Sequence, residues 1–254
     1  MRITFLGTGT SHGVPMIGCG CATCTSTDPR DRRLRPSIYV ETAATRVLVD
    51  AGPDLRAQAL RHGIARVDAI LFTHGHADHI LGMDDVRRFN AVMGAPMPCY
   101  GDAATLEDVR RMFSYVFDAA TPKGGGLPQL DLHLIDGRFS VGDVDVLPVP
   151  LLHGRRPVLG FRFGRFAYLT DCNAIPDGSW PLLEGLHVLV LDALRLRPHP
   201  THFSVDEAVE TATRIGASRT FFTHMCHDLL HAATDPRLPA GMALAYDGLV
   251  LELP

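Results

Sequence analysis

Short apolar segments, bounded by glycine, proline and aspartate, recur along the whole chain and predict β-strands. The segments with this pattern are residues 3–6, 38–41, 46–49, 69–72, 144–149, 159–163, 166–169, 188–191 and 249–253. Helical spacing of apolar residues is rarer and predicts helices at residues 54–62, 78–89, 103–117 and 205–215. Ser204 precedes the last of these, with Glu207 three residues on, as in a capping box. The pattern predicts an α/β protein in which helices cover the outer faces of two sheets.

The length of 254 residues is compatible with one large domain or with two small ones. The best candidate for a linker is Gly124-Gly125-Gly126, which lies between Pro122 and Pro128. This stretch is short and strand-like sequence resumes at once, so we interpret it as a loop within a domain. We therefore predict a single domain that spans residues 1–254.

The composition is that of a water-soluble globular protein, with 46% hydrophobic and 20% charged residues. Because the chain has no run of about 18 apolar residues, no membrane span is expected. The first residues resemble a strand rather than a signal peptide, which predicts a cytoplasmic location. The net charge of −4 provides no general attraction to nucleic acid. The one dense basic run, Arg30, Arg32, Arg33 and Arg35, is interpreted as a solvated loop.

Three histidines and an aspartate occur within six positions, directly after the apolar run 67–72: His74, His76, Asp78 and His79. His74 and His76 alternate as residues leaving a strand do, so both rings can point the same way, whereas Asp78 and His79 begin the next helix. One metal could not easily use all four side chains. A solvated histidine-rich loop is the alternative, but the position directly after a buried-strand pattern favours a metal site.

Four further polar residues stand where strands are predicted to end: His153, Asp171, His202 and His224. Each has an ordinary alternative, which is a surface histidine or, for Asp171, a turn or helix cap. Together with the first cluster, these residues match the ligands that two adjacent metals need when they share one carboxylate and keep open positions for water. The sequence thus predicts a dinuclear metal site.

The order and context of these residues resemble the metallo-β-lactamase superfamily over nearly the whole chain. The resemblance implies a four-layer αβ/βα sandwich of two mixed sheets, with helices on the outer faces and the metals at one edge. It implies that Asp171 bridges two metals, that Asp50 supports the site without binding a metal, and that the lactam-opening branch is excluded. The ligands implied for the first metal are His74, His76 and His153, and those for the second are Asp78, His79 and His224.

Cys19, Cys21 and Cys24 have the spacing C-x-C-x-x-C within a glycine-rich loop. Thiolates favour zinc, and His227, three residues after His224, is the best candidate for the fourth ligand of a tetrahedral site. Buried or redox-active thiols are the alternative interpretation. The arrangement resembles the family of phosphoribosyl cyclic-phosphate phosphodiesterases of the carbon-phosphorus lyase pathway. That resemblance implies a structural zinc in a loop at residues 19–24, apart from the catalytic metals.

The same resemblance implies that His202 acts on the phosphate or on the leaving group. The alternative is a histidine of the segment that caps the following helix. His12 is a further candidate for a pocket, in a segment whose glycine spacing is more typical of a turn. Cys99, Cys172 and Cys226 are interpreted as small hydrophobic residues, although Cys172 and Cys226 neighbour proposed ligands.

These features predict a metal-dependent phosphodiesterase that hydrolyses a small phosphodiester through a hydroxide bridging two metals. The resemblance implies that this phosphodiester is a cyclic ribose phosphate. Asp78 is expected to orient the hydroxide, and His202 to stabilise charge or protonate the leaving oxygen. The expected cofactors are two divalent metals, zinc or manganese, and one structural zinc. The expected partner is a small-molecule substrate rather than nucleic acid or membrane, and a homodimer is left open.

Two alternatives to this function remain at the level of the sequence. One is a tRNA 3′-end endonuclease similar to ribonuclease Z, a family that shares the ligand series and a histidine like His202. Members of that family normally carry a long protruding arm for tRNA, and no insertion with that character is evident. The other is a non-catalytic coenzyme-biosynthesis or carrier protein on the same fold.

Overall fold

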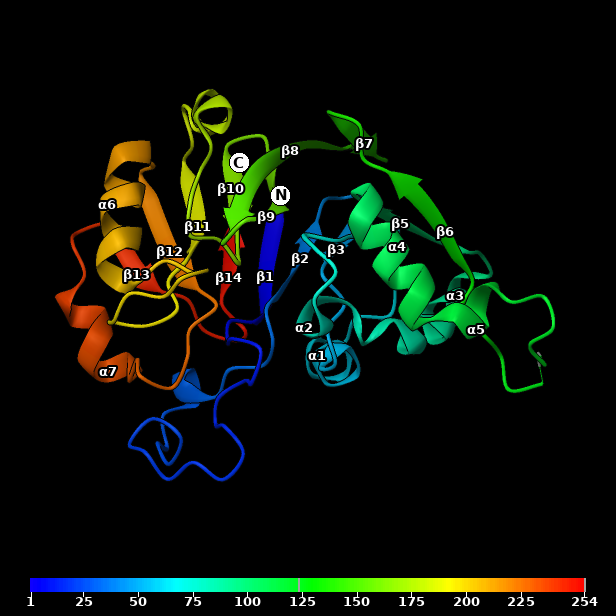
Figure 1. The fold of residues 1–254 in the computed structure, drawn as a ribbon, viewed down its shortest axis with the longest axis horizontal. Coiled ribbons are helices and arrows are strands. Elements are labelled where there is room, and N and C mark those ends of the chain that lie inside the picture. Colours follow the sequence, from blue (N-terminus) through cyan, green and yellow to red (C-terminus); the bar gives the residue numbers. More distant parts are fainter. Residues whose placement is uncertain (123, 254) are drawn as a thin grey trace.

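The computed structural model describes residues 1–122 and 124–253, so Lys123 and Pro254 of the predicted domain lie outside the described residues. Two seven-stranded sheets face each other, and helices cover the outer face of each (Figure 1). The strand order is β14-β1-β2-β3-β4-β5-β6 in the first sheet and β13-β12-β11-β10-β9-β8-β7 in the second. The predicted αβ/βα sandwich of two mixed sheets is confirmed.

The strands of the first sheet are β1 (Arg2–Gly7), β2 (Ser37–Glu41), β3 (Arg46–Val49), β4 (Ala69–Leu71), β5 (Met97–Gly101), β6 (Leu130–Leu134) and β14 (Val250–Glu252). Those of the second are β7 (Phe139–Val141), β8 (Val144–His153), β9 (Arg156–Phe163), β10 (Phe166–Leu169), β11 (Val188–Asp192), β12 (Arg219–Thr223) and β13 (Met242–Leu244). The helices beside the first sheet are α1 (Leu55–His62), α2 (Ala77–Ile80), α3 (Val86–Met93), α4 (Ala103–Met112) and α5 (Ser114–Phe117). The remaining helices are α6 (Val205–Ile215) and α7 (His231–Thr234), with short 3-10 turns η1 (Pro29–Asp31), η2 (Met83–Asp85), η3 (Asp177–Leu183) and η4 (Asp235–Arg237).

Both faces of the central strands are buried, which explains why the sequence shows continuous apolar runs there. In β3, Val47 and Val49 belong to the core between the two sheets, whereas Leu48 packs toward the helical layer of the first sheet. In β11, Val190 lies between the sheets and Leu191 contributes to the core shared with α6. Successive side chains of a strand point to opposite faces, so one strand serves two cores.

Parallel pairing sends several strands toward the same edge of the sandwich. In the first sheet, three neighbouring strands run parallel: β3, β4 and β5. In the second sheet, the parallel neighbours are β10, β11 and β12. The carboxyl ends of parallel strands meet at one edge, where loops can present side chains. At the opposite end, the Met1 amino group donates a hydrogen bond of 2.7 Å to the Leu253 carbonyl, and β1 pairs with β14.

The prediction of one continuous helix at residues 78–89 is wrong. The chain forms α2, then η2, then α3, with the break at Leu81 and Gly82. The Gly82 amide donates to the Ala51 carbonyl (2.8 Å), and a Cβ at Gly82 would lie 2.0 Å from the Gly52 carbonyl oxygen. The helix therefore stops because another backbone segment passes in contact with it, a tertiary cause that periodicity does not encode.

Other predictions of local structure also needed correction. The helix expected at 103–117 is interrupted at Phe113, whose φ of −112° and ψ of 38° are not helical. Strands β5, β6, β7 and β13 were not predicted. The interpretation of the basic run as a solvated loop is wrong for Arg33, which is 1% exposed. Its guanidinium donates to Asp31 (3.0 Å) and to the carbonyls of Cys226 and Leu229 (3.0 and 2.6 Å).

Among residues 1–122 and 124–253, no helix combines the length and the apolar character needed to cross a bilayer.

We predict that Gly82→Ala destabilises the protein by about 2–4 kcal/mol, because the added methyl group must displace the backbone at Gly52. Urea denaturation would measure this change in the free energy of unfolding. Gly178→Ala is the matched control, since a Cβ there meets nothing within 4 Å. Equal stability of the two variants would contradict the proposed close contact.

Candidate metal centres and active site

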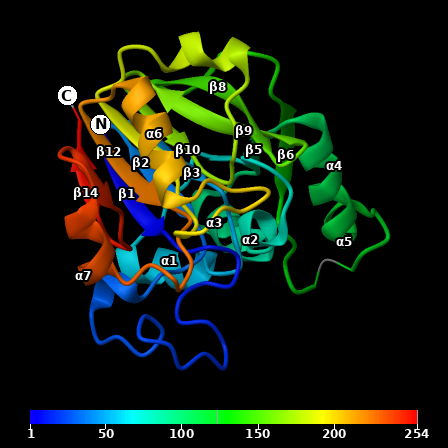
Figure 2. The same cartoon turned by 60° about the vertical axis from the view of Figure 1, so that its left-hand side comes forward.

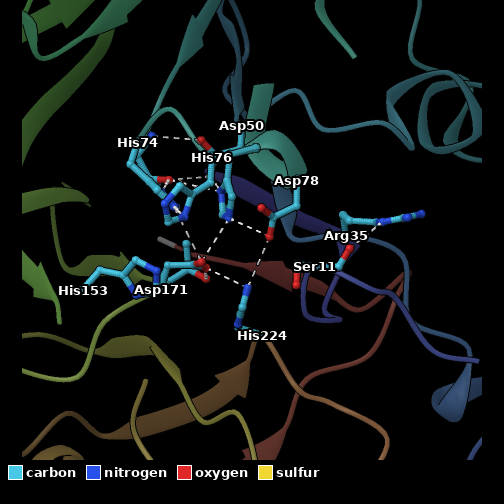
Figure 3. A network of polar contacts seen from close by, with 12 residues as sticks. Ser11, Arg35, Asp50, His74, His76, Asp78, His153, Asp171 and His224 are labelled. Carbon is cyan, nitrogen blue, oxygen red and sulfur yellow. Dashed lines mark hydrogen bonds and ion pairs between the residues drawn. The ribbon is translucent and has the colours of Figure 1, made fainter. Parts of the chain in front are cut away.

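Six buried polar side chains come from the ends of six strands at one edge of the sandwich. Figure 3 labels five of them: Asp50, His74, His153, Asp171 and His224. Asp50 directly follows β3 and His224 directly follows β12, whereas Asp171 lies two residues after the end of β10. His74 lies shortly after β4, His153 is the last residue of β8 and Asp192 is the last residue of β11. His76, Asp78 and His79 belong to the turn and to α2 that follow His74. Rigid sheets therefore hold the site, while the turns after them provide its remaining side chains.

The backbone is strained at three of these positions. Asp50, Asp171 and His224 have φ values of 63°, 52° and 61°, and they are the non-glycine residues with positive φ in the described part of the chain. Such a conformation costs on the order of 1–3 kcal/mol per residue and persists only where the surroundings enforce it. Its concentration at one edge makes that edge the candidate functional site.

The side chains form two groups that share Asp171. The first comprises His74, His76, His153 and Asp171, and the second comprises Asp78, His79, Asp171 and His224, with ligand atoms within 4.8 Å of one another in each group. Asp171 Oδ1 lies 3.0 Å from His224 Nε2, and Asp171 Oδ2 lies 3.2 Å from His79 Nε2. Asp171 Oδ2 is also 3.8 Å from His74 Nε2. The structure thus brings together all seven predicted ligands around one shared carboxylate.

The donor set fits divalent metals. A tetrahedral ion with bonds of about 2.1 Å would hold its ligand atoms about 3.4 Å apart, close to the separations around Asp171. The Nε2 atoms of His79 and His224 are buried, and within the described residues neither makes a hydrogen bond, although both face carboxylate oxygens. Buried polar atoms without partners are rare, so these nitrogens are suited to bind a cation.

Surrounding residues orient these rings. Asp50 accepts hydrogen bonds from the Thr73 amide (2.9 Å), the Thr73 hydroxyl (2.8 Å) and His79 Nδ1 (2.7 Å). It lies beneath the ligands, as the family resemblance implies for this residue. His153 Nδ1 donates to the Thr201 carbonyl (2.8 Å). In both histidines a hydrogen bond occupies Nδ1, so Nε2 is the nitrogen that would bind a metal.

The buried carboxylates of the site raise the pKa of two of its histidines. Burial alone would lower the pKa of His224, but the Asp171 and Asp78 carboxylates raise that pKa to about 10. Burial opposes charge on His79 as well, yet Asp171, Asp78 and Asp50 hold its pKa well above the usual value. Burial and the neighbouring charge of His79 lower the pKa of His74. Without metal ions, protons on His79 and His224 balance the carboxylates.

His202 lies at the side of the ligand groups, and an aspartate that the sequence analysis missed holds it there. His202 Nδ1 lies 2.8 Å from Asp192 Oδ2, and both side chains are buried. The ring of His202 stacks on the ring of His224, with 4.7 Å between their centroids. It contacts the ring of His153 edge-on, with 4.6 Å between the centroids. Asp192 ends a predicted strand, and its position at a strand end like that of Asp171 could have revealed it.

The structure brings the three predicted cysteines together with His227. His227 Nδ1 lies 3.2, 3.5 and 3.7 Å from the Sγ atoms of Cys19, Cys21 and Cys24. A hydrogen bond from the Cys24 amide lowers the pKa of Cys21 to about 6, whereas burial raises that of Cys24 to about 11. Three sulfurs around one imidazole nitrogen match the ligands of a tetrahedral zinc site.

The other cysteines join no group of metal-ligating side chains within the described residues. Cys99 and Cys172 are buried and Cys226 is partly buried, and burial raises the pKa of each thiol. This agrees with their interpretation as small hydrophobic residues.

Residues 45–225 match the family model of the Beta-lactamase superfamily domain. The chain belongs to the metallo-β-lactamase superfamily. Within it, the chain is similar to a crystallised diphosphatase of the PhnP family, with 47% identity, a TM-score of 0.93 and coverage of 100% of this chain and 98% of that one.

The chain is also similar in sequence to two curated proteins. An octanoyltransferase of Porphyromonas gingivalis is 37% identical over 98% of this chain, which spans only 51% of that protein. A ribonuclease Z of Mycolicibacterium gilvum is 29% identical over 83% of each chain.

We predict that metal binding at the dinuclear site releases protons from His79 and His224 at pH 7, because neighbouring carboxylates raise the pKa of both imidazoles in the metal-free protein, to about 10 for His224. Metal affinity should accordingly fall as the pH falls. Calorimetric titration of the metal-free protein in buffers of different ionisation enthalpy would count the protons. An observed enthalpy that is independent of the buffer would contradict this charge balance.

We predict that Cys21→Ser lowers the zinc content by about one equivalent per chain and reduces the melting temperature, because serine is a poor zinc ligand. Elemental analysis and thermal denaturation would measure the two effects. Cys226→Ser is the matched control, since Cys226 lies outside the cysteine group. Full zinc content in Cys21→Ser would refute the assignment of this site.

Proposed function

We propose that the protein is a metal-dependent hydrolase that cleaves a small phosphodiester, with a cyclic ribose phosphate as the substrate class. The observation that carries this proposal is the pair of ligand groups joined through Asp171, with His202 beside them. The similarity to a diphosphatase at 47% identity supports phosphorus chemistry at this site.

One divalent cation would be held by His74, His76 and His153. The other would be held by Asp78, His79 and His224, and Asp171 would be shared by both. Bound there, the cations would supply a water that ionises near neutral pH and positive charge opposite the phosphate oxygens. Asp78 is 8% exposed, so its carboxylate can accept a hydrogen bond from the attacking water while it faces His79 and His224. Zinc and manganese are the metals that we propose for this mixed histidine and carboxylate set.

His202 can provide the proton that the leaving oxygen needs. Its Nδ1 is engaged by Asp192, so Nε2 is the nitrogen available to the substrate. Asp192 stays buried and positions the ring, and its carboxylate stabilises the protonated imidazole. His202 also lines a hollow of about 300 Å³, a volume that suits a small substrate.

Ribonuclease Z activity is the second candidate, favoured by the 29% identical relative. The family resemblance also implies a histidine like His202 in that enzyme. The small hollow beside His202 argues for a small molecule instead of tRNA. A non-catalytic coenzyme-biosynthesis or carrier role is a third candidate, against which the complete set of ligand side chains argues. The cytoplasmic location and the homodimer remain predictions.

We predict that Asp78→Asn lowers the turnover of bis(p-nitrophenyl) phosphate at least about 100-fold, because a neutral amide neither binds the metal strongly nor orients the water. Asp85→Asn, a change of the same kind in the neighbouring turn η2, is the control and should retain activity. Steady-state kinetics with the metal content measured in parallel would test this. Unchanged turnover in Asp78→Asn would remove Asp78 from the mechanism.

A panel of four substrates separates the candidate functions in the same assay. The panel comprises bis(p-nitrophenyl) phosphate, a ribose cyclic phosphate, precursor tRNA and a thioester. Turnover of the two small phosphodiesters is expected. Turnover of the thioester alone, or of tRNA alone, would overturn the proposed function.

A further inference from the structure

Three segments form the hollow beside His202. One wall comes from the segment that leads into the cysteine loop and includes His12 and Met16. A second wall comes from the connection between β11 and α6, and the third from the turn after β12, which includes His227. The loop extends from the same edge of the sandwich, next to α7 (Figure 2). A substrate beside His202 would thus meet the segment before the cysteine loop and His227, which contacts the cysteines.

The lining of this hollow carries more positive than negative groups. Arg195 and Arg197 line it, together with three histidines besides His202, and Asp228 is the single carboxylate among its lining residues. Arg195 donates hydrogen bonds to the carbonyls of Arg197 and Pro198 (3.1 and 2.9 Å). These bonds stabilise the connection between β11 and α6. The Arg197 side chain is 79% exposed, and its nearest carboxylate oxygen, on Asp228, is 3.7 Å away. Arg197 can therefore contact an anion that enters the hollow.

His227 faces both the cysteines and the hollow. Its Nδ1 lies among the three sulfurs, and its Nε2, on the other side of the ring, is 3.9 Å from Asp228 Oδ1. His227 and Asp228 both line the hollow. An imidazole that binds zinc through Nδ1 must carry its remaining proton on Nε2. Zinc would therefore fix His227 as a permanent hydrogen-bond donor toward the hollow.

The turn that carries His227 is also tied to the dinuclear site. His224 lies three residues before it, and the intervening Met225 amide donates to the Thr8 carbonyl (2.9 Å). The Thr10 amide donates to the Met225 carbonyl (3.1 Å), and Arg33 donates to that of Cys226 (3.0 Å). These bonds hold His227 at a fixed place relative to the ligand groups.

We propose that the turn after β12 and the connection between β11 and α6 form a substrate-binding element, in which His227 Nε2–H and Arg197 bind a second anionic group of the substrate, remote from the scissile bond. This inference rests on the proposed function. It assigns the zinc site a role in recognition in addition to its role in stability.

His227→Cys tests the role of the imidazole, because a thiolate can complete a four-cysteine zinc site but offers no Nε2–H. The probes are ribose cyclic phosphate with and without a 5-phosphate, and the readout is the ratio of their kcat/KM values. Zinc content should stay at the wild-type level, while the preference for the 5-phosphate falls about 10-fold, mainly through KM. Retained zinc with an unchanged ratio would show that His227 is only structural and would overturn the proposal.

A second variant tests the hollow without touching the cysteine group. Arg197→Ala should lower the same ratio about 10-fold, whereas Arg138→Ala, which removes an exposed arginine on the β7 side of the second sheet, should not change it. An unchanged ratio in Arg197→Ala overturns the proposal even if His227→Cys loses zinc. If wild-type protein cleaves neither probe, the proposed function fails, whereas equal cleavage of both probes refutes only this inference.

Discussion

Four aspartates are buried at one edge of the sandwich, and much of the molecule serves to compensate their charge. Asp50, Asp78, Asp171 and Asp192 are each less than 9% exposed. Carboxylates removed from water are costly unless cations or hydrogen bonds face them, so each one meets histidine nitrogens or backbone amides. The strand ends and the hydrogen bonds beneath the site hold these groups against their mutual repulsion. A cluster of this kind is stable only as a place where positive charge binds.

The sequence was sufficient to predict the main architecture and the seven side chains that the structure brings together at the candidate metal site. Seven residues from His74 to His224 were identified because histidines at strand ends are uncommon and because they match a known series. Asp192 was missed because a single aspartate after an apolar run is common, and only the fold places it against His202. Its position after a predicted strand is a weak signal, and only the contact with His202, ten residues away in the sequence, shows what it does.

The errors in local structure have a common physical origin. The break at Gly82 depends on a contact with Gly52, and the burial of Arg33 depends on carbonyl groups near residue 226. Strand β5 contains Pro98 between Met97 and Cys99, which weakens its pattern, while its neighbours β4 and β6 stabilise it. In each case tertiary contacts overrode a local preference, and such contacts involve residues far away in the sequence.

The pairing of β1 with β14 places both ends of the described chain at the edge of the sandwich opposite the candidate site. β1 runs toward the site edge, so Met1 and Leu253 meet about 20 Å away from it, the length of a six-residue strand. A polypeptide joined to either end would leave the candidate active site open. This edge is therefore suitable for the attachment of other domains. The octanoyltransferase relative, of which this chain spans about half, shows that such sequence does occur within a longer protein. The architecture separates the place where chemistry is proposed from the place where new domains can be attached.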